Sequence, residues 1–231
     1  MKLAILGNSH TAALMHALRA EPSLATGIDL TFFASIGRTM GDFAVQADRL
    51  VPQTAELRDS ISNTAGGATY FEPKAFDMLA FVGLGFNMPL MDKRLSVAVQ
   101  DAVIRNCVVG SIAWQVIGQV RTIADLPILV GHTPLRAGEV TNQHSDMLSN
   151  ATPYEAQLKL AQTYWLTQNA QVLPQPDITR YCDILTRRSF SRGSRGLRGA
   201  GLEHDNADRS HMNAEYGAIY LRHMFAALRA M

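Results

Sequence analysis

The sequence contains very little cysteine, almost no net charge and no long apolar run. Its two cysteines among 231 residues, Cys107 and Cys182, lie far apart and form no CxxC pattern, which argues against a disulfide framework or a zinc knuckle. The formal net charge is +1, whereas proteins dedicated to nucleic acid usually carry a large basic excess that replaces the counterions of phosphate. Nucleic acid is therefore not an expected partner.

The apolar stretches all fall well short of the roughly 20 residues that span a bilayer. At the amino terminus, the apolar run between Lys2 and Gly7 has four residues, which is too short for the apolar centre of a secretory signal. We therefore expect no membrane span and a cytoplasmic location. A chain from which a signal had already been removed would have the same appearance.

Hydrophobic residues make up 47% of the chain, enough to bury a sizeable core, so a disordered or fibrous protein is not expected. Short, continuous apolar segments alternate with stretches of helical periodicity. The apolar segments predict strands buried on both faces, at residues 2–6, 29–34, 78–82, 127–130 and 170–173. The periodic stretches predict helices at residues 11–20, around 43–60, across 95–123 with a break at Gly110, and at 153–168 and 214–230.

This alternation predicts right-handed crossovers and a parallel sheet covered by helices on both faces. No repeat or linker marks a second domain, so we expect one domain over residues 1–231. Residues 186–211 break the pattern, because they have almost no apolar periodicity and are rich in glycine and arginine. Loops of this length inside a compact domain are usually functional or mobile.

The first predicted strand is followed by the sequence Gly-Asn-Ser-His at residues 7–10, directly before a helix. In open parallel sheets, ligands bind beyond the carboxyl ends of the strands. The Ser9 hydroxyl at this edge becomes a nucleophile only when a base removes its proton, and the base needs an orienting partner. Asp208 and His211, three residues apart near the other end of the chain, can supply both. Asn87, just past the third strand, can donate to a developing oxyanion.

These motifs resemble those of the SGNH (GDSL-like) hydrolases. The family's serine motif is matched by residues 7–9, and the glycine that contributes a backbone N–H to the oxyanion hole is matched by Gly37. The Gly-x-Asn-Asp motif is matched at residues 85–87, with Met88 in place of the aspartate, and the final Asp-x-x-His motif at residues 208–211. The motifs follow the family's order and cover the chain from residue 4 to about residue 217.

The resemblance implies a flavodoxin-like three-layer α/β/α sandwich around a central parallel sheet of about five strands. It also implies a serine esterase without metal or organic cofactor, acting on an acyl ester that we expect to be short and carried by a carbohydrate or other small molecule. Ser9, Asp208 and His211 would form the catalytic triad. The backbone N–H groups of Ser9 and Gly37 and the side chain of Asn87 would form the oxyanion hole. The missing aspartate at Met88 ordinarily braces the loop that carries Asn87.

Two other functions use the same residues. An O-acyltransferase would pass the acyl group to a sugar or alcohol, and a non-catalytic binding module would keep the fold without the activity, an alternative that Met88 favours. Single residues also have simpler interpretations: Ser9 as a helix cap, Asn87 as a turn residue before proline, and Gly37 as a loop glycine with Gly41 close by.

Several polar residues beside these motifs have open roles. In the Gly/Arg-rich loop at about 186–207, the arginines at 187, 188, 192, 195 and 198 are most simply a solvated loop. A sharper interpretation has Arg192 and Arg195 binding an anionic substrate. His132 is expected at the rim of the site, either near the substrate or as an ordinary loop histidine. His10 is expected in a surface or packing role. The residues at 204, 205, 208 and 211 suggest a metal cluster, but their spacing matches no metal motif, so we expect no metal.

Overall fold

The computed structural model describes residues 1–139, 149–197 and 203–231. Its central element is a parallel sheet of five strands in the order β2-β1-β5-β6-β8. These strands are β1 (Lys2–Gly7), β2 (Asp29–Ala34), β5 (Met78–Val82), β6 (Ile128–Gly131) and β8 (Ala170–Leu173). Numbered along the chain, the order is 2-1-3-4-5, which is the flavodoxin-like arrangement. The predicted strands are confirmed, with shifts of one residue at the ends of β1 and β6.

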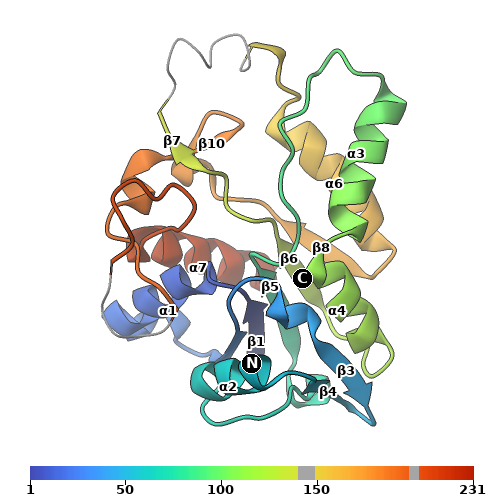
Figure 1. Ribbon diagram of the computed structural model, residues 1–231, viewed down its shortest axis with the longest axis vertical. Helices are drawn as coiled ribbons and strands as arrows, with labels where there is room; N and C mark the ends of the chain where they lie inside the picture. The colour runs from blue at the N-terminus through green and yellow to red at the C-terminus, as the bar shows by residue number, and fades with distance from the viewer. Residues whose placement is uncertain (140–148, 198–202) are drawn as a thin grey trace.

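Helices cover both faces of this sheet and make three layers (Figure 1). Because successive side chains of a strand point to opposite faces, Leu3 and Ile5 of β1 pack on one core cluster, and Ala4 and Leu6 pack on the other. The first face is covered by α1 (Thr11–Ala20) and α7 (Ala214–Arg229), which lie side by side. The second is covered by α2 (Ala55–Thr64), α3 (Val97–Val109), α4 (Ile112–Arg121) and α6 (Tyr154–Leu166).

The helix predicted around residues 43–60 is wrong in its first half. An antiparallel hairpin of β3 (Phe43–Gln46) and β4 (Arg49–Pro52) occupies that part, and α2 begins only at Ala55. Pro52 lacks the N–H that a helix interior requires, and the Thr54 side chain caps α2 by accepting from the Leu57 N–H. The predicted break at Gly110 is confirmed, because α3 ends before it and Ser111 caps α4.

The segment 186–211 is less irregular than its composition suggests. It starts inside β10 (Leu185–Arg187), which pairs with β7 (Ala137–Gly138) and β9 (Arg180–Tyr181) in a small separate sheet. Arg198 lies outside the described residues. Short 3₁₀ helices occur at Pro22–Ala25, Thr39–Gly41, Pro73–Ala75, Asp177–Thr179 and Arg188–Ser191.

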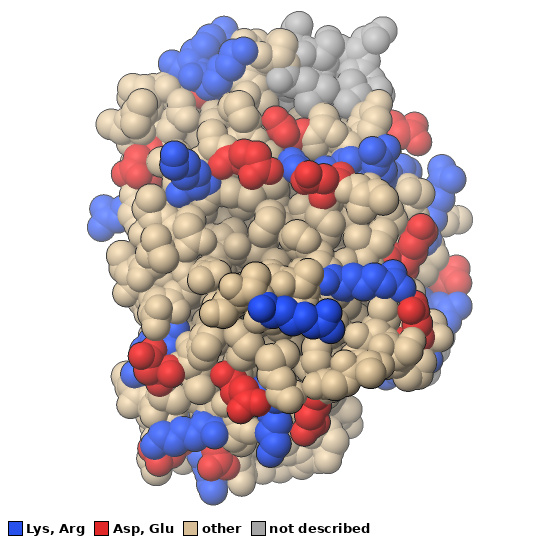
Figure 2. Space-filling view, turned by 180° about the vertical axis from the view of Figure 1, so that it is seen from behind, with Lys and Arg blue, Asp and Glu red and all other residues tan. Residues whose placement is uncertain are grey.

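The surface carries charges of both signs. On the face seen in Figure 2, Lys and Arg side chains are interspersed with Asp and Glu side chains and with uncharged residues. None of the helices in the described part of the chain combines the length and the apolar character needed to cross a membrane.

Candidate active site

The turn after β1 presents Ser9 at the carboxyl edge of the sheet. Asn8 fixes this turn from both ends of its amide: Nδ2 donates to the Gly83 carbonyl over 2.7 Å, and Oδ1 accepts from the His10 backbone N–H over 3.1 Å. A β-carbon at Gly83 would lie 2.3 Å from Asn8 Oδ1, and the φ of Gly83 is +73°. Only glycine fits this close approach of the two strand ends.

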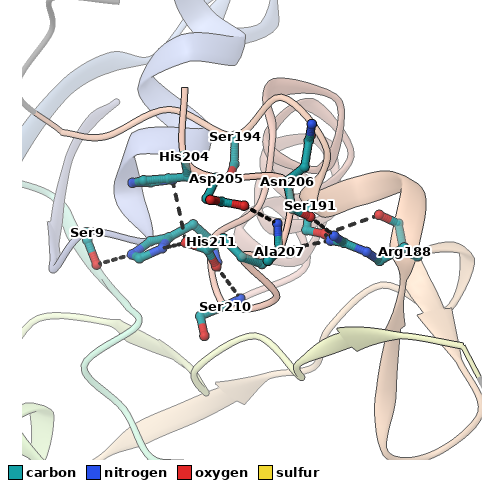
Figure 3. A network of polar contacts seen from close by, with 11 residues as sticks. Ser9, Arg188, Ser191, Ser194, His204, Asp205, Asn206, Ala207, Ser210 and His211 are labelled. Carbon is teal, nitrogen blue, oxygen red and sulfur yellow. Dashed lines mark hydrogen bonds and ion pairs between the residues drawn. The ribbon is translucent and has the colours of Figure 1, made fainter. Parts of the chain in front are cut away.

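The structure brings together the serine, histidine and aspartate that the motifs select. His211 Nε2 lies 3.0 Å from Ser9 Oγ (Figure 3). His211 Nδ1 lies 2.8 Å from Asp208 Oδ2. The second carboxylate oxygen of Asp208 accepts from the backbone N–H groups of Ser210 and His211. His211 is held just ahead of α7, whose first turn is capped by the Asn213 side chain.

The charge of Asp208 fixes the proton positions in this chain of hydrogen bonds. Burial alone would raise the pKa of Asp208, but the hydrogen bonds from the His211 side chain and from the two backbone N–H groups outweigh it and lower the pKa to about 2. The carboxylate is therefore anionic at neutral pH and accepts the proton of His211 Nδ1. His211 Nε2 is left as the acceptor for the Ser9 hydroxyl, which is the arrangement of a general base and its nucleophile.

Ser9 does not act as a helix cap here. The N-cap residue of α1 is His10, and no side chain caps that helix. The Ser9 hydroxyl is instead paired with His211.

Three candidate oxyanion donors remain unpaired in the described part of the chain. Neither the Ser9 nor the Gly37 backbone N–H, nor the Asn87 amide, donates a hydrogen bond to a described residue. Gly37, at a φ of +60°, and Asn87 line the same cavity of about 380 Å³, together with Asn8 and His10. Gly41 does not line this cavity.

The loop that carries Asn87 is braced by backbone contacts with the loop after β6. The Thr133 N–H donates to the Phe86 carbonyl over 2.8 Å, and a β-carbon at Gly85 would lie 2.4 Å from the Gly131 carbonyl oxygen. Met88 is partly buried and packs against the apolar core. Thr133 was not predicted from the sequence, because its contact joins two loops that are distant along the chain.

His132 is buried beneath this loop rather than facing a cavity. Tyr154 accepts from the Gln175 N–H, so its own proton is available to His132 Nε2, 2.6 Å away. The proton of the ring is then on Nδ1, 2.6 Å from the Thr133 carbonyl. Burial lowers the pKa of His132 to about 4. With both nitrogens engaged, the neutral ring supports the wall of the site.

A second, larger cavity of about 780 Å³ shares part of its lining with the smaller one. His10, Asn87 and Thr133 line both cavities. The larger cavity is also lined by Ser210, which lies between the aspartate and the histidine of the triad, and by apolar residues that include Met88, Pro89, Leu90, Pro134, Leu135 and Ile184. Four charged residues, Arg136, Glu139, Asp183 and Arg209, complete its lining.

The arginines of the loop fall into two groups. Arg192 and Arg195 line a separate pocket of about 630 Å³ with His16 and Arg19, and they line neither of the two cavities that contain Asn87. Arg188 instead turns toward the triad and donates to the Asp208 carbonyl over 2.8 Å, with further contacts to Ser191 and Asn206 (Figure 3). This bracing role of Arg188 has no signature in the sequence.

Three possible metal ligands also converge here. His204, Asp208 and His211 offer ligand atoms within 4.8 Å of one another, whereas Asp205 binds the backbone N–H of Ala207. The two imidazole rings are stacked, with centroids 4.2 Å apart and planes inclined by 30°. Nitrogen lone pairs lie in the ring plane, so rings stacked in this way do not direct them at one tetrahedral centre. The group fits a ring stack better than a metal site.

No protein-family model and no curated protein sequence matches this chain. Among solved structures, a DUF4886 family protein from Bacteroides uniformis is 13% identical to this chain with a TM-score of 0.47. The alignment covers 100% of this chain and 83% of that protein's chain. The periplasmic domain of a lipopolysaccharide acetyltransferase from Salmonella ser. Paratyphi A has 9% identity, coverages of 100% and 84%, and a TM-score of 0.45. A carbohydrate acetylesterase from Sinorhizobium meliloti has 14% identity, coverages of 99% and 98%, and a TM-score of 0.43. Likenesses this distant do not identify the reaction of this chain.

Proposed function

We propose that this protein is a serine esterase of the SGNH type that cleaves an acyl ester through an acyl-enzyme. The observation that carries the proposal is the continuous hydrogen-bonded chain from Ser9 through His211 to Asp208, with distances of 3.0 and 2.8 Å. A serine hydroxyl paired with an imidazole, which in turn donates to an anionic carboxylate, is the arrangement that activates a nucleophile.

In the proposed reaction, His211 removes the proton of Ser9 as the hydroxyl attacks the acyl carbon. Asp208 stabilises the imidazolium that forms, and the N–H groups of Ser9 and Gly37 and the Asn87 amide stabilise the oxyanion. His211 then protonates the departing alcohol, and a water molecule activated by the same ring releases the acid.

The two cavities support a division of the substrate between them. The departing alcohol must lie within reach of His211, whose neighbour Ser210 lines the larger cavity, whereas the candidate oxyanion donors Gly37 and Asn87 line the smaller one. We therefore assign the acyl group to the cavity of about 380 Å³ and the alcohol to the cavity of about 780 Å³. This favours a short acyl group on a larger alcohol with apolar and polar faces, such as a sugar.

The first test is labelling with a fluorophosphonate, which reacts with activated serines. We expect rapid labelling of the wild type, none of Ser9→Ala, and wild-type labelling of Ser23→Ala, an exposed serine that lines neither cavity. A folded wild type that is not labelled would contradict the esterase proposal and favour a binding module.

A second test addresses the substrate. We expect p-nitrophenyl esters to be cleaved more slowly as the acyl chain lengthens. Cys107→Phe, which narrows the smaller cavity, should sharpen this preference, and the control Val109→Phe, on an exposed position of the same helix, should not. A preference for long chains would contradict the assignment.

Acyl transfer is the second candidate function, because a cavity of about 780 Å³ has room for an acceptor alcohol after the first alcohol has left. Comparing the products formed with and without a candidate sugar acceptor distinguishes the two reactions. A transferase would form the acylated sugar in place of the free acid.

A further inference from the structure

The ring of His211 is contacted by two further imidazoles that take no part in the proposed reaction. Both nitrogens of His211 are already paired, one with Ser9 and one with Asp208, so only its faces and its C–H edges remain free. His204 stacks on it with ring centroids 4.2 Å apart, and His10 with centroids 5.5 Å apart; each pair of planes is inclined by 30°. The nearer of the two, His204, lies above His211 in Figure 3.

His204 is held in place from two sides by one buried residue. Its backbone N–H donates to the Ser194 carbonyl over 2.8 Å, and its Nδ1 lies 3.2 Å from Ser194 Oγ. Ser194 is buried, and an ion pair of 3.1 Å between Arg195 and Glu203 ties together the same two strands of chain. The position of the His204 ring is therefore fixed independently of its contact with His211.

The rings of His204 and His10 are both neutral at neutral pH. Burial, together with the proximity of His211, lowers the pKa of His204, and the same two causes lower the pKa of His10 to about 4. The charged groups that face them are His211 itself and Asp208, whose Oδ2 lies 4.0 Å from His204 Nδ1. An imidazolium that forms on His211 therefore meets the faces of neutral rings, which attract a cation, and no like charge.

We propose that His204 is a positioning residue of the catalytic site: its ring stacks on His211 and holds the plane in which Nε2 faces Ser9 and Nδ1 faces Asp208. The inference rests on the proposed esterase function. The two hydrogen bonds of His211 lie in the plane of its ring and resist sliding of the ring within that plane. They do not resist rotation of the ring about the Nδ1–Nε2 line. That rotation is resisted only by the groups that pack on the faces of the ring. His204 supplies the closer of the two ring contacts, and His10 supplies the other.

Three variants separate the ring from the hydrogen bond that holds it. His204→Phe keeps a stacking ring without a nitrogen, His204→Asn keeps a polar group for Ser194 without a ring, and His204→Ala keeps neither. Arg195→Gln is the control, because it removes the ion pair of the same loop but keeps the His204 ring and its two contacts with Ser194. Each variant is assayed for kcat and KM on p-nitrophenyl acetate, for the rate of fluorophosphonate labelling, and for Tm.

We expect His204→Ala and His204→Asn to lower kcat and the labelling rate in parallel by about tenfold, within the ~100-fold that a misplaced catalytic group can cost. KM should stay within about twofold, and His204→Phe should recover both rates to within about threefold. Wild-type rates in His204→Ala, or a folded His204→Phe as slow as His204→Ala, would overturn the inference. So would an equal loss in Arg195→Gln, because loop order would then be the cause.

The outcome also separates this inference from the function beneath it. Ser9-dependent labelling that is equally fast in the wild type and in His204→Ala would remove the role of His204 and leave the esterase proposal standing. A wild type that the probe does not label would overturn both.

Discussion

A β-carbon added to Gly217 in α7 would come within 2.1 Å of the carbonyl oxygen of Ala13 in α1. The two helices therefore meet backbone to backbone at this point. Ser9 lies two residues ahead of α1, and His211 lies three residues ahead of α7. Because each helix is rigid, their close contact sets the separation of the two side chains that precede them.

Gly217→Ala should accordingly destabilise the protein and disturb the site together. Its β-carbon would meet backbone atoms of Ala13 and Leu14, which cannot yield as a flexible side chain can. We expect a loss of about 1–3 kcal/mol in the free energy of unfolding and a fall in kcat larger than stability alone explains. Urea denaturation and ester hydrolysis measure the two effects.

Gly118→Ala is the matched control. Gly118 also lies inside a helix, α4, but a β-carbon there would have no atom within 4 Å. In this variant, the free energy of unfolding should rise by roughly 0.5–1 kcal/mol, and the activity should be unchanged. Equal effects of the two substitutions would show that helix propensity, and not the contact with α1, governs position 217.

Asn8→Asp should weaken the turn that presents Ser9. A carboxylate can accept from the His10 N–H, but it cannot donate to the Gly83 carbonyl as the Asn8 amide does over 2.7 Å. Two acceptors facing each other without a proton cost about 1–3 kcal/mol. We expect a lower Tm at pH 7 and slower fluorophosphonate labelling, with no such change in Asn63→Asp, an exposed position of α2 that lines neither cavity. An unchanged Tm in Asn8→Asp would show that the turn does not depend on this donor.

Asn87→Ala tests whether this residue stabilises the oxyanion or only shapes a turn. An oxyanion donor acts in the transition state, so its loss should lower kcat by about a hundredfold or more while KM and Tm change little. A turn residue would give the opposite pattern, a lower Tm with kcat preserved. Steady-state kinetics and thermal unfolding of the same preparation distinguish them.

Two buried histidines should make the fold sensitive to mild acid. The pKa values of His10 and His132 are lowered to about 4, in both cases mainly by burial, whereas the unfolded chain takes up these protons near pH 6.5. The unfolded state therefore binds more protons between these values, and stability falls as the pH drops from about 6.5 toward 4.

Urea denaturation at pH 7.5 and at pH 5 measures this loss. Between the two pKa values, we expect each histidine to lower the free energy of unfolding by about 1 kcal/mol for each pH unit. His10→Gln should show a smaller difference between the two pH values than the wild type. A difference of the same size in both proteins would remove His10 as a cause.

The sheet was predictable because its strands are short apolar runs with turn residues at both ends, as at residues 29–34, 78–82 and 170–173. The hairpin at Phe43–Pro52 was not, because four-residue strands are too short for their periodicity to be told from that of a helix. Two residues mark the boundary in the sequence: Pro52 does not fit inside a helix, and Thr54 caps the start of α2.

For the site, the sequence identified the residues that sit at strand ends and helix starts, where the fold class decides their position. Ser9, Asp208 and His211 belong to this group, and the structure brings them within hydrogen-bonding distance. The supporting contacts of Arg188, Thr133 and His204 were not predicted. Each depends on how irregular loops fold over the triad, and no local pattern in the sequence records that.

The hydroxyl of Ser9 and the imidazole of His211 are separated by 202 positions along the chain. At a synthesis rate of about 5–20 residues per second, roughly 10–40 seconds pass on the ribosome between one residue and the other. During that time the serine has no base, and a chain released early carries an inert hydroxyl. For the proposed esterase, activity would therefore require completed translation of both helices.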